Sequence, residues 1–139
     1  MSGEDNKNLN LRWIGAFNRR DWPAEAASRT GDYVAHMQGA PGPLDSQGWA
    51  EFMSLFATAF PDGEIAVEAS ISEGDVVASR WTMTGTHNGD FLGVPPTGRP
   101  VTMKGIDFSR VVDGKIAEHW AQFDVIGVMQ QIGAMPAPA

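Results

Sequence analysis

One continuous stretch decides the fold: it reads THNGDFLGVPPTGR at residues 86–99 and continues, after a further strand, as DGKI at 113–116 and EHW at 118–120. Apolar and polar residues alternate on both sides of the Asp113-Gly114 pair. This alternation predicts two long antiparallel strands, because Asp-Gly favours the tight turn that joins hairpin strands. The paired prolines before the strands predict a stiff loop. The hairpin also carries the histidine and the carboxylates that are the best candidates for a functional site. We therefore expect the site to lie on this hairpin.

The same period-two alternation occurs in four segments and predicts a four-stranded antiparallel meander. These segments are residues 64–71, 76–86, 101–112 and 116–123. Residues 31–38 are too short to assign, and they fit either a short strand or the edge of a turn.

The first half of the chain has apolar residues at helical spacing instead. Three helices are predicted there, over residues 8–20, 24–28 and about 46–60. Pro23 is a favoured residue for opening the second helix, and Asp45 or Ser46 supplies the N-cap of the third. After the strands, residues 125–132 are predicted to form a short helix and residues 134–139 a frayed tail.

Length and composition limit the class of protein. The 139 residues predict one domain over 1–139, ordered from about residue 5 to residue 133. With no cysteine, disulfides, cysteine-ligated zinc and thiol nucleophiles are excluded. A net charge of −7 and scattered basic residues argue against a nucleic-acid partner. No apolar run is long enough to cross a bilayer, so we expect no membrane partner and a cytoplasmic location.

Helices followed by long antiparallel strands predict an α+β fold with helices packed on one face of a curved sheet. The order of elements and five motifs together resemble the SnoaL-like polyketide cyclases, or ester cyclases, of the nuclear-transport-factor-2-like superfamily. The motifs lie at residues 85–98, 105–107, 113–116, 118–120 and 124–127. The resemblance implies a cone-shaped fold with an apolar cavity between the concave sheet face and the three N-terminal helices. It also implies a homodimer through the outer sheet face, where Ile106, Phe108 and Trp120 are expected.

Characterised members of this family close a polyketide ring by an intramolecular aldol step, without a metal or an organic cofactor. They use an acid/base Asp on the last strand and a His on the preceding strand. Aligned through DGKI, the Asp position falls on Ala121 and the His position falls on Asp107. Limonene-epoxide hydrolases share the fold and use an Arg-x-Asp pair plus a second Asp. Arg80 and Asp124 fit two of those three positions, but Thr82 stands where the essential Asp would be.

Three residues are candidates for catalysis. Removing a proton next to a carbonyl needs a base with a pKa near the working pH, which an apolar pocket can give to a carboxyl group. Asp107 lies in mid-strand among small and apolar neighbours and is the candidate base, unless it pairs with a basic residue or is solvated. His119 has the same strand parity as Ala121 and could polarise a carbonyl, or it could be a half-buried structural histidine. Asp124 could share that role, or it could cap the helix that follows.

A second set of residues is expected to form the apolar wall of a ligand pocket, although core packing alone would also explain most of them. The set comprises Trp13, Trp49, Phe56, Trp81, Met83, Phe91 and Met103. His36 completes the eight expected wall residues, because the resemblance implies a histidine near the cavity mouth that could contact ligand, or it could be exposed to solvent. The three histidines show no metal-ligand spacing, and the chain has no phosphate-binding loop, so we expect no metal and no cofactor.

Three functions remain open from the sequence. The first is a cofactor-independent cyclase or isomerase that acts on an apolar carbonyl compound. The second is a module that binds a hydrophobic small molecule without turnover, which the loss of both usual cyclase residues favours. The third is a dimeric interaction domain whose cavity is filled by aromatic side chains.

Overall fold

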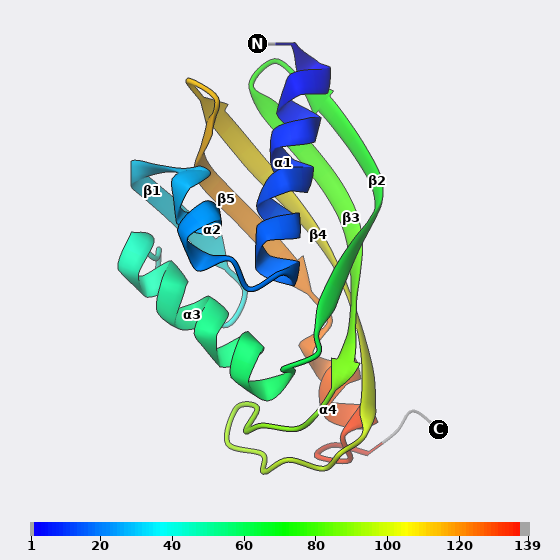
Figure 1. Cartoon of the computed structure of the whole chain (residues 1–139). Helices are drawn as coiled ribbons and strands as arrows, with labels where there is room; N and C mark the ends of the chain where they lie inside the picture. Colours follow the sequence, from blue (N-terminus) through cyan, green and yellow to red (C-terminus); the bar gives the residue numbers. More distant parts are fainter. Residues whose placement is uncertain (1, 137–139) are drawn as a thin grey trace.

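The computed structural model describes residues 2–136, which form a curved five-stranded sheet and four helices (Figure 1). The helices are α1 (Gly3–Asn18), α2 (Trp22–Ala27), α3 (Ser46–Ala59) and α4 (Val125–Gln131). The strands are β1 (Arg29–Met37), β2 (Glu64–Glu73), β3 (Val76–Thr86), β4 (Pro100–Val112) and β5 (Lys115–Phe123). Figure 1 shows α1, α2 and α3 together on one side of the sheet. The predicted α+β architecture is confirmed.

The strand order is β1-β5-β4-β3-β2, and β2 to β5 form the predicted antiparallel meander. Asp113 and Gly114 both have positive φ angles, of 50° and 75°, as expected for a tight primed turn between β4 and β5. The fifth strand, β1, lies in the segment that the sequence left unassigned. It runs parallel to β5, with Ala35 opposite His119. This pairing joins segments far apart in sequence, so no local pattern could indicate it.

Side-chain caps set the helix boundaries. Asp45 is the N-cap of α3, because its Oδ1 accepts the backbone N–H of Gly48 at 2.8 Å. The second helix begins earlier than predicted, because Asp21 caps it by accepting the backbone N–H of Ala24. It also ends one residue earlier, at Ala27. The first helix also begins earlier, at a capping box that Ser2 forms with Asp5.

The core lies between α1, α3 and the concave sheet face. Along β4 the side chains alternate between buried and exposed, and Asp107 falls on the buried, inward side with Met103. The outward side carries Ile106 and Phe108, which are 55% and 50% exposed. A Cβ atom at Gly105 would overlap the ring of Trp81, so the glycine lets that ring approach the backbone of β4 closely.

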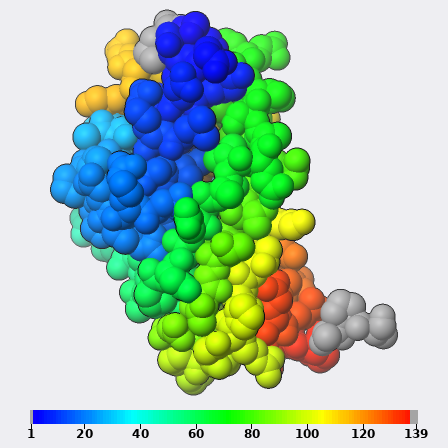
Figure 2. Space-filling view, turned by 45° about the vertical axis from the view of Figure 1, so that its right-hand side comes forward, coloured from blue at the N-terminus to red at the C-terminus, as the bar shows by residue number. Residues whose placement is uncertain are grey.

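The C-terminal helix α4 lies at the end of the molecule away from the N-terminus (Figure 2). Gln131 ties it to the start of β4 through the backbone N–H and C=O of Thr102. Beyond α4, Ala134 and Met135 both donate backbone hydrogen bonds to Met129. Residues 137–139 of the predicted frayed tail lie outside the described residues. No helix within residues 2–136 is both long and apolar enough to cross a membrane.

Candidate functional site

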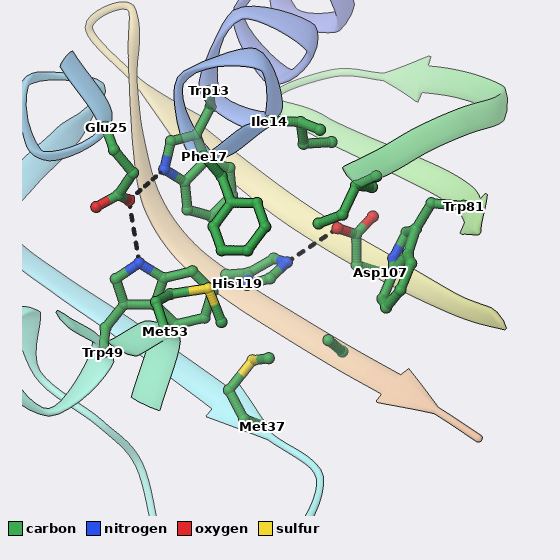
Figure 3. A pocket seen from close by; sticks show the side chains of 12 residues that line it. Trp13, Ile14, Phe17, Glu25, Met37, Trp49, Met53, Trp81, Asp107 and His119 are labelled. Atoms are coloured by element: carbon green, nitrogen blue, oxygen red, sulfur yellow. Dashed lines mark hydrogen bonds and ion pairs between the residues drawn. The ribbon is translucent and has the colours of Figure 1, made fainter. Parts of the chain in front are cut away.

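Two adjoining cavities, of about 80 and 50 Å³, lie between the helices and the concave face of the sheet. The larger is lined by apolar side chains with three exceptions, Glu25, Asp107 and His119 (Figure 3). The smaller is lined only by apolar and aromatic residues, apart from Gly63. The polar chemistry of the cavities is therefore confined to two carboxylates and one imidazole.

Asp107 and His119 form a buried pair at the floor of the larger cavity. His119 Nε2 lies 3.0 Å from Asp107 Oδ2, and the two side chains are only 6% and 7% exposed. They come from neighbouring antiparallel strands, where Asp107 stands opposite Ala121 and His119 opposite Ser109. The pair is thus a diagonal cross-strand contact, within the reach of these side chains.

Each member of the pair keeps one polar atom without a partner. Asp107 Oδ1 and His119 Nδ1 are buried and make no hydrogen bond to any described residue. Buried polar atoms of this kind are rare in folded proteins and call for an explanation such as a catalytic role or a bound molecule. Both residues line the larger cavity, although these two atoms are themselves enclosed by protein.

Aromatic rings surround the imidazole. The indoles of Trp13 and Trp49 meet the His119 ring edge to face, at centroid distances of 5.0 and 5.4 Å. Both indoles are about 95% buried, so they keep bulk water away from the pair. In such surroundings, electrostatic interactions and hydrogen bonds are stronger than in water.

Glu25 is the second carboxylate on the cavity wall, and its oxygens are fully engaged. Its Oε2 accepts the indole N–H groups of Trp13 and Trp49, at 2.6 and 3.0 Å. Arg29 donates to both oxygens, at 2.9 and 3.1 Å. Glu25 therefore has a compensating charge and no free oxygen, whereas Asp107 has a free oxygen. Of the two carboxylates, only Asp107 has an oxygen without a hydrogen bond from the described residues.

The structure brings six of the eight expected wall residues to the two cavities. Trp13, Trp49 and Trp81 line the larger cavity, and Phe56, Met83 and Met103 line the smaller. Phe91 is buried but lines neither, because its ring packs behind the cavity against Phe56 and Phe60.

His36 is not brought to the cavities. Its position opposite Trp120 in the β1–β5 register turns it to the outer face of the sheet. There its Nε2 lies 2.7 Å from Glu118 Oε2, and its ring stacks on Trp120. The parallel pairing of β1 fixes this orientation, and the sequence did not reveal that pairing.

Asp124 is not brought to the cavities either. It is the N-cap of α4, with its Oδ1 accepting the backbone N–H of Gly127 at 2.8 Å. The arrangement suggested by the epoxide hydrolases is also absent from the cavities, since Arg80 and Thr82 point to the outer face and both contact Glu68. Of the three catalytic candidates, only Asp107 and His119 lie together.

Glu25 is the polar wall residue that the sequence reading missed. The sequence does contain a pattern that indicates an ion pair, because Glu25 and Arg29 are spaced i, i+4, as in helical ion pairs. Nothing in that spacing shows that the pair is buried. Met37 and Met53 were missed as wall residues for the same reason, since their burial depends on how the elements pack. Within residues 2–136, no three His, Asp or Glu side chains gather as a metal site would require.

The fold corresponds to that of a known family. The chain belongs to the SnoaL-like polyketide cyclase family, whose model matches residues 7–132. The resemblance read from the motifs, and the nuclear-transport-factor-2-like fold that it implied, are confirmed.

The chain is also similar to solved structures and to curated proteins. The chain superposes on AclR from Streptomyces galilaeus, a proposed hydroxylase, with a TM-score of 0.90 and 32% identity, covering 99% of this chain and 87% of AclR. It superposes on IdmH from Streptomyces antibioticus, a proposed polyketide cyclase, with a TM-score of 0.84 and 34% identity. The match covers 92% of this chain and 98% of IdmH. It is 28% identical over 110 residues to the aklanonic acid methyl ester cyclase DauD from Streptomyces sp. (strain C5), covering 73% of this chain and 68% of DauD.

Proposed function

We propose that the protein is a cofactor-independent cyclase that closes a ring in an apolar, polyketide-like carbonyl compound by acid/base catalysis. One observation carries the proposal: a buried carboxylate with a free oxygen, Asp107, is hydrogen-bonded to His119 on the wall of an apolar cavity. The similarity to the cyclase DauD supports the class of substrate.

The reaction is an intramolecular aldol addition. Asp107 Oδ1 takes a proton from the carbon next to a carbonyl group, and the electron pair of that C–H bond forms an enolate. The enolate carbon attacks a second carbonyl carbon of the same molecule, which forms the new C–C bond. The oxygen of that second carbonyl then takes the proton from Asp107. Substrate and product have the same composition, and the carboxylate is restored.

His119 has two tasks in this scheme. Its Nε2–H donates to Asp107 Oδ2, which leaves Oδ1 for the substrate. When the ring is doubly protonated, Nδ1 donates a hydrogen bond to the oxygen on which negative charge develops. The family's usual carboxylate position is occupied by Ala121, directly opposite Asp107. In this chain, carboxylate and imidazole have therefore exchanged strands, with the imidazole displaced along β5.

A polyketide needs more room than the cavities offer. Ligand pockets usually measure about 300–1,000 Å³, well above the 80 and 50 Å³ found here. The cavities share Met37 and Met53 as wall residues. Joined as they stand, the two cavities would still be too small. Methionine side chains are unbranched and adaptable, so we propose that their movement both joins and widens the cavities when substrate binds.

The test is ring closure of aklanonic acid methyl ester and related methyl esters by the purified protein, followed by mass spectrometry coupled to chromatography. We expect Asp107→Asn to lower the rate by about 10²–10⁴-fold, the usual contribution of an acid/base group. Asp124→Asn is the matched control, because it changes a carboxylate outside the cavity and asparagine can still cap α4. Equal rates for wild type and Asp107→Asn would refute the mechanism.

A second candidate is ligand binding without turnover, which the alanine at position 121 favours. It predicts that the same esters raise the melting temperature of the wild type by binding its native state. It also predicts that no ring-closed product forms. Measuring product and melting temperature in the same samples separates the two functions.

A further inference from the structure

The side chain of Glu25 connects three helices at one buried point. It extends from α2, is 4% exposed, and accepts the indole N–H of Trp13 from α1 and of Trp49 from α3 on the same oxygen (Figure 3). Hydrogen bonds to a charged acceptor are shorter and stronger than neutral ones, and the bond from Trp13 measures 2.6 Å. The two indoles are therefore held in fixed orientations by one carboxylate.

Those two indoles are the rings that enclose His119. Their centroids lie 5.6 Å apart, and each meets the imidazole nearly at a right angle, with interplanar angles of 81° and 88°. Among the described residues, the only hydrogen bond of the His119 ring is to Asp107. One hydrogen bond leaves the ring free to tilt about that contact, so packing against the indoles must set its plane.

We propose that Glu25 is a positioning residue for the Asp107–His119 pair. Its carboxylate fixes the two indoles, the indoles fix the plane of the His119 ring, and that plane holds Nε2 against Asp107 Oδ2. Glu25 does not take part in proton transfer itself, because Trp13, Trp49 and Arg29 occupy its oxygens. The effect of Glu25 on catalysis rests on the proposed function. Its effect on the orientation of the indoles and of the His119 ring does not.

The simpler alternative is that Glu25 only anchors α2 to the rest of the fold. Two variants separate the alternatives. Glu25→Gln keeps the shape but removes the charge, leaving the Arg29 charge without its partner. Glu25→Leu combined with Arg29→Met removes both charges, and replacement of a buried ion pair by apolar residues often preserves or raises stability. Both variants deprive the indoles of their charged acceptor.

The first measurement is nuclear magnetic resonance of the full-length protein labelled with ¹⁵N, which resolves the ring nitrogens of tryptophan and histidine. In both variants we expect the indole signals of Trp13 and Trp49 to move upfield and the ring signals of His119 to shift with them. Trp120 and His36 stack together on the outer face, so their signals are expected to stay in place. Unchanged His119 signals in both variants, despite moved indole signals, would overturn the proposal.

The second measurement is the kinetics of ring closure. We expect both variants to lower kcat by about 10-fold or more, with KM within about twofold, because displacement of a reacting group by about 1 Å can cost about 100-fold. Glu51→Gln is the matched control, since Glu51 is an exposed carboxylate of α3 with a 3.4 Å contact from Gln47. Unchanged kcat in both Glu25 variants overturns the proposal. A wild type without turnover refutes the proposed function instead, and the His119 signals then decide the positioning role alone.

Discussion

Two histidine–carboxylate pairs lie on opposite faces of β5. The inner pair, His119 and Asp107, has a 3.0 Å contact between side chains that are 6% and 7% exposed. The outer pair, His36 and Glu118, has a 2.7 Å contact between side chains that are 33% and 26% exposed. Glu118 and His119 are neighbours in sequence, so the pleat of the strand alone sends them to opposite faces.

The difference between the pairs lies in their surroundings. Glu118 also contacts Arg110, and the hydrogen bond from His36, with a smaller contribution from Arg110, lowers its pKa below the ordinary value. Water and salt screen such a pair, which then contributes little beyond local order. No arginine or lysine of the described residues forms an ion pair with Asp107. The same two chemical groups therefore make an ordinary surface contact outside and a candidate catalytic pair inside.

The largest contrast is expected in catalysis. His119→Gln removes a ring that can carry a proton and is expected to lower kcat/KM for ring closure by about 100-fold or more. His36→Gln makes the same change on the outer face and is expected to leave kcat/KM unchanged. Initial rates of both variants on one methyl ester substrate check this. Comparable losses in the two variants would mean that the inner pair has no special role.

The next contrast concerns stability at two adjacent residues. Ala121 is buried opposite Asp107, so Ala121→Asp places a second carboxylate in the cavity and is expected to cost about 2–5 kcal/mol. Gln122→Asp, on the exposed face, is expected to change stability by about 0.5 kcal/mol or less. Urea denaturation at pH 7 measures both. The cost at position 121 should shrink at low pH, where protonation removes the repulsion.

A smaller effect tests whether Asp124 belongs with the inner pair. As an N-cap, it is expected to contribute about 1 kcal/mol, which Asp124→Ala removes and Asp124→Asn largely retains. Neither variant should slow ring closure at temperatures where the protein is folded. A loss of turnover in Asp124→Asn as large as that in Asp107→Asn would place Asp124 in the catalytic machinery.

The smallest effect is a pH dependence of the outer pair. The pKa of Glu118 is lowered from its ordinary value of 4.5, so its contribution to stability is fully present above the unfolded-state pKa. That contribution is lost as the pH falls through the lower folded-state pKa. The difference in unfolding free energy between wild type and Glu118→Gln should therefore be positive at pH 7 and vanish in strong acid. A difference that grows on acidification would contradict the assignment.

Much of the fold and part of the site follow from local patterns. Period-two alternation placed Asp107 and His119 on the two strands of one hairpin. The Asp113-Gly114 turn alone would set His119 opposite the outward-facing Phe108, and a β-bulge at Ala117 shifts the register so that His119 lies opposite Ser109, on the face of Asp107. The helical stripe of the first half placed Trp13 and Trp49 toward the sheet. Each of these predictions depends on residues close in sequence or on a single hairpin.

The sequence determined the elements, the hairpin and the family, because these follow from short-range periodicity and turn chemistry. The β-bulge at Ala117, which no local pattern predicted, decided that Asp107 and His119 share one face. Tertiary structure alone decided that β1 pairs in parallel with β5, which turns His36 outward. It also decided between the two roles open to Asp124, which caps α4. It also decided that Glu25 meets two indoles from different helices, which no spacing in the chain encodes. Which side chains lose contact with water depends on how separate elements pack, and packing brings together residues that are distant in sequence.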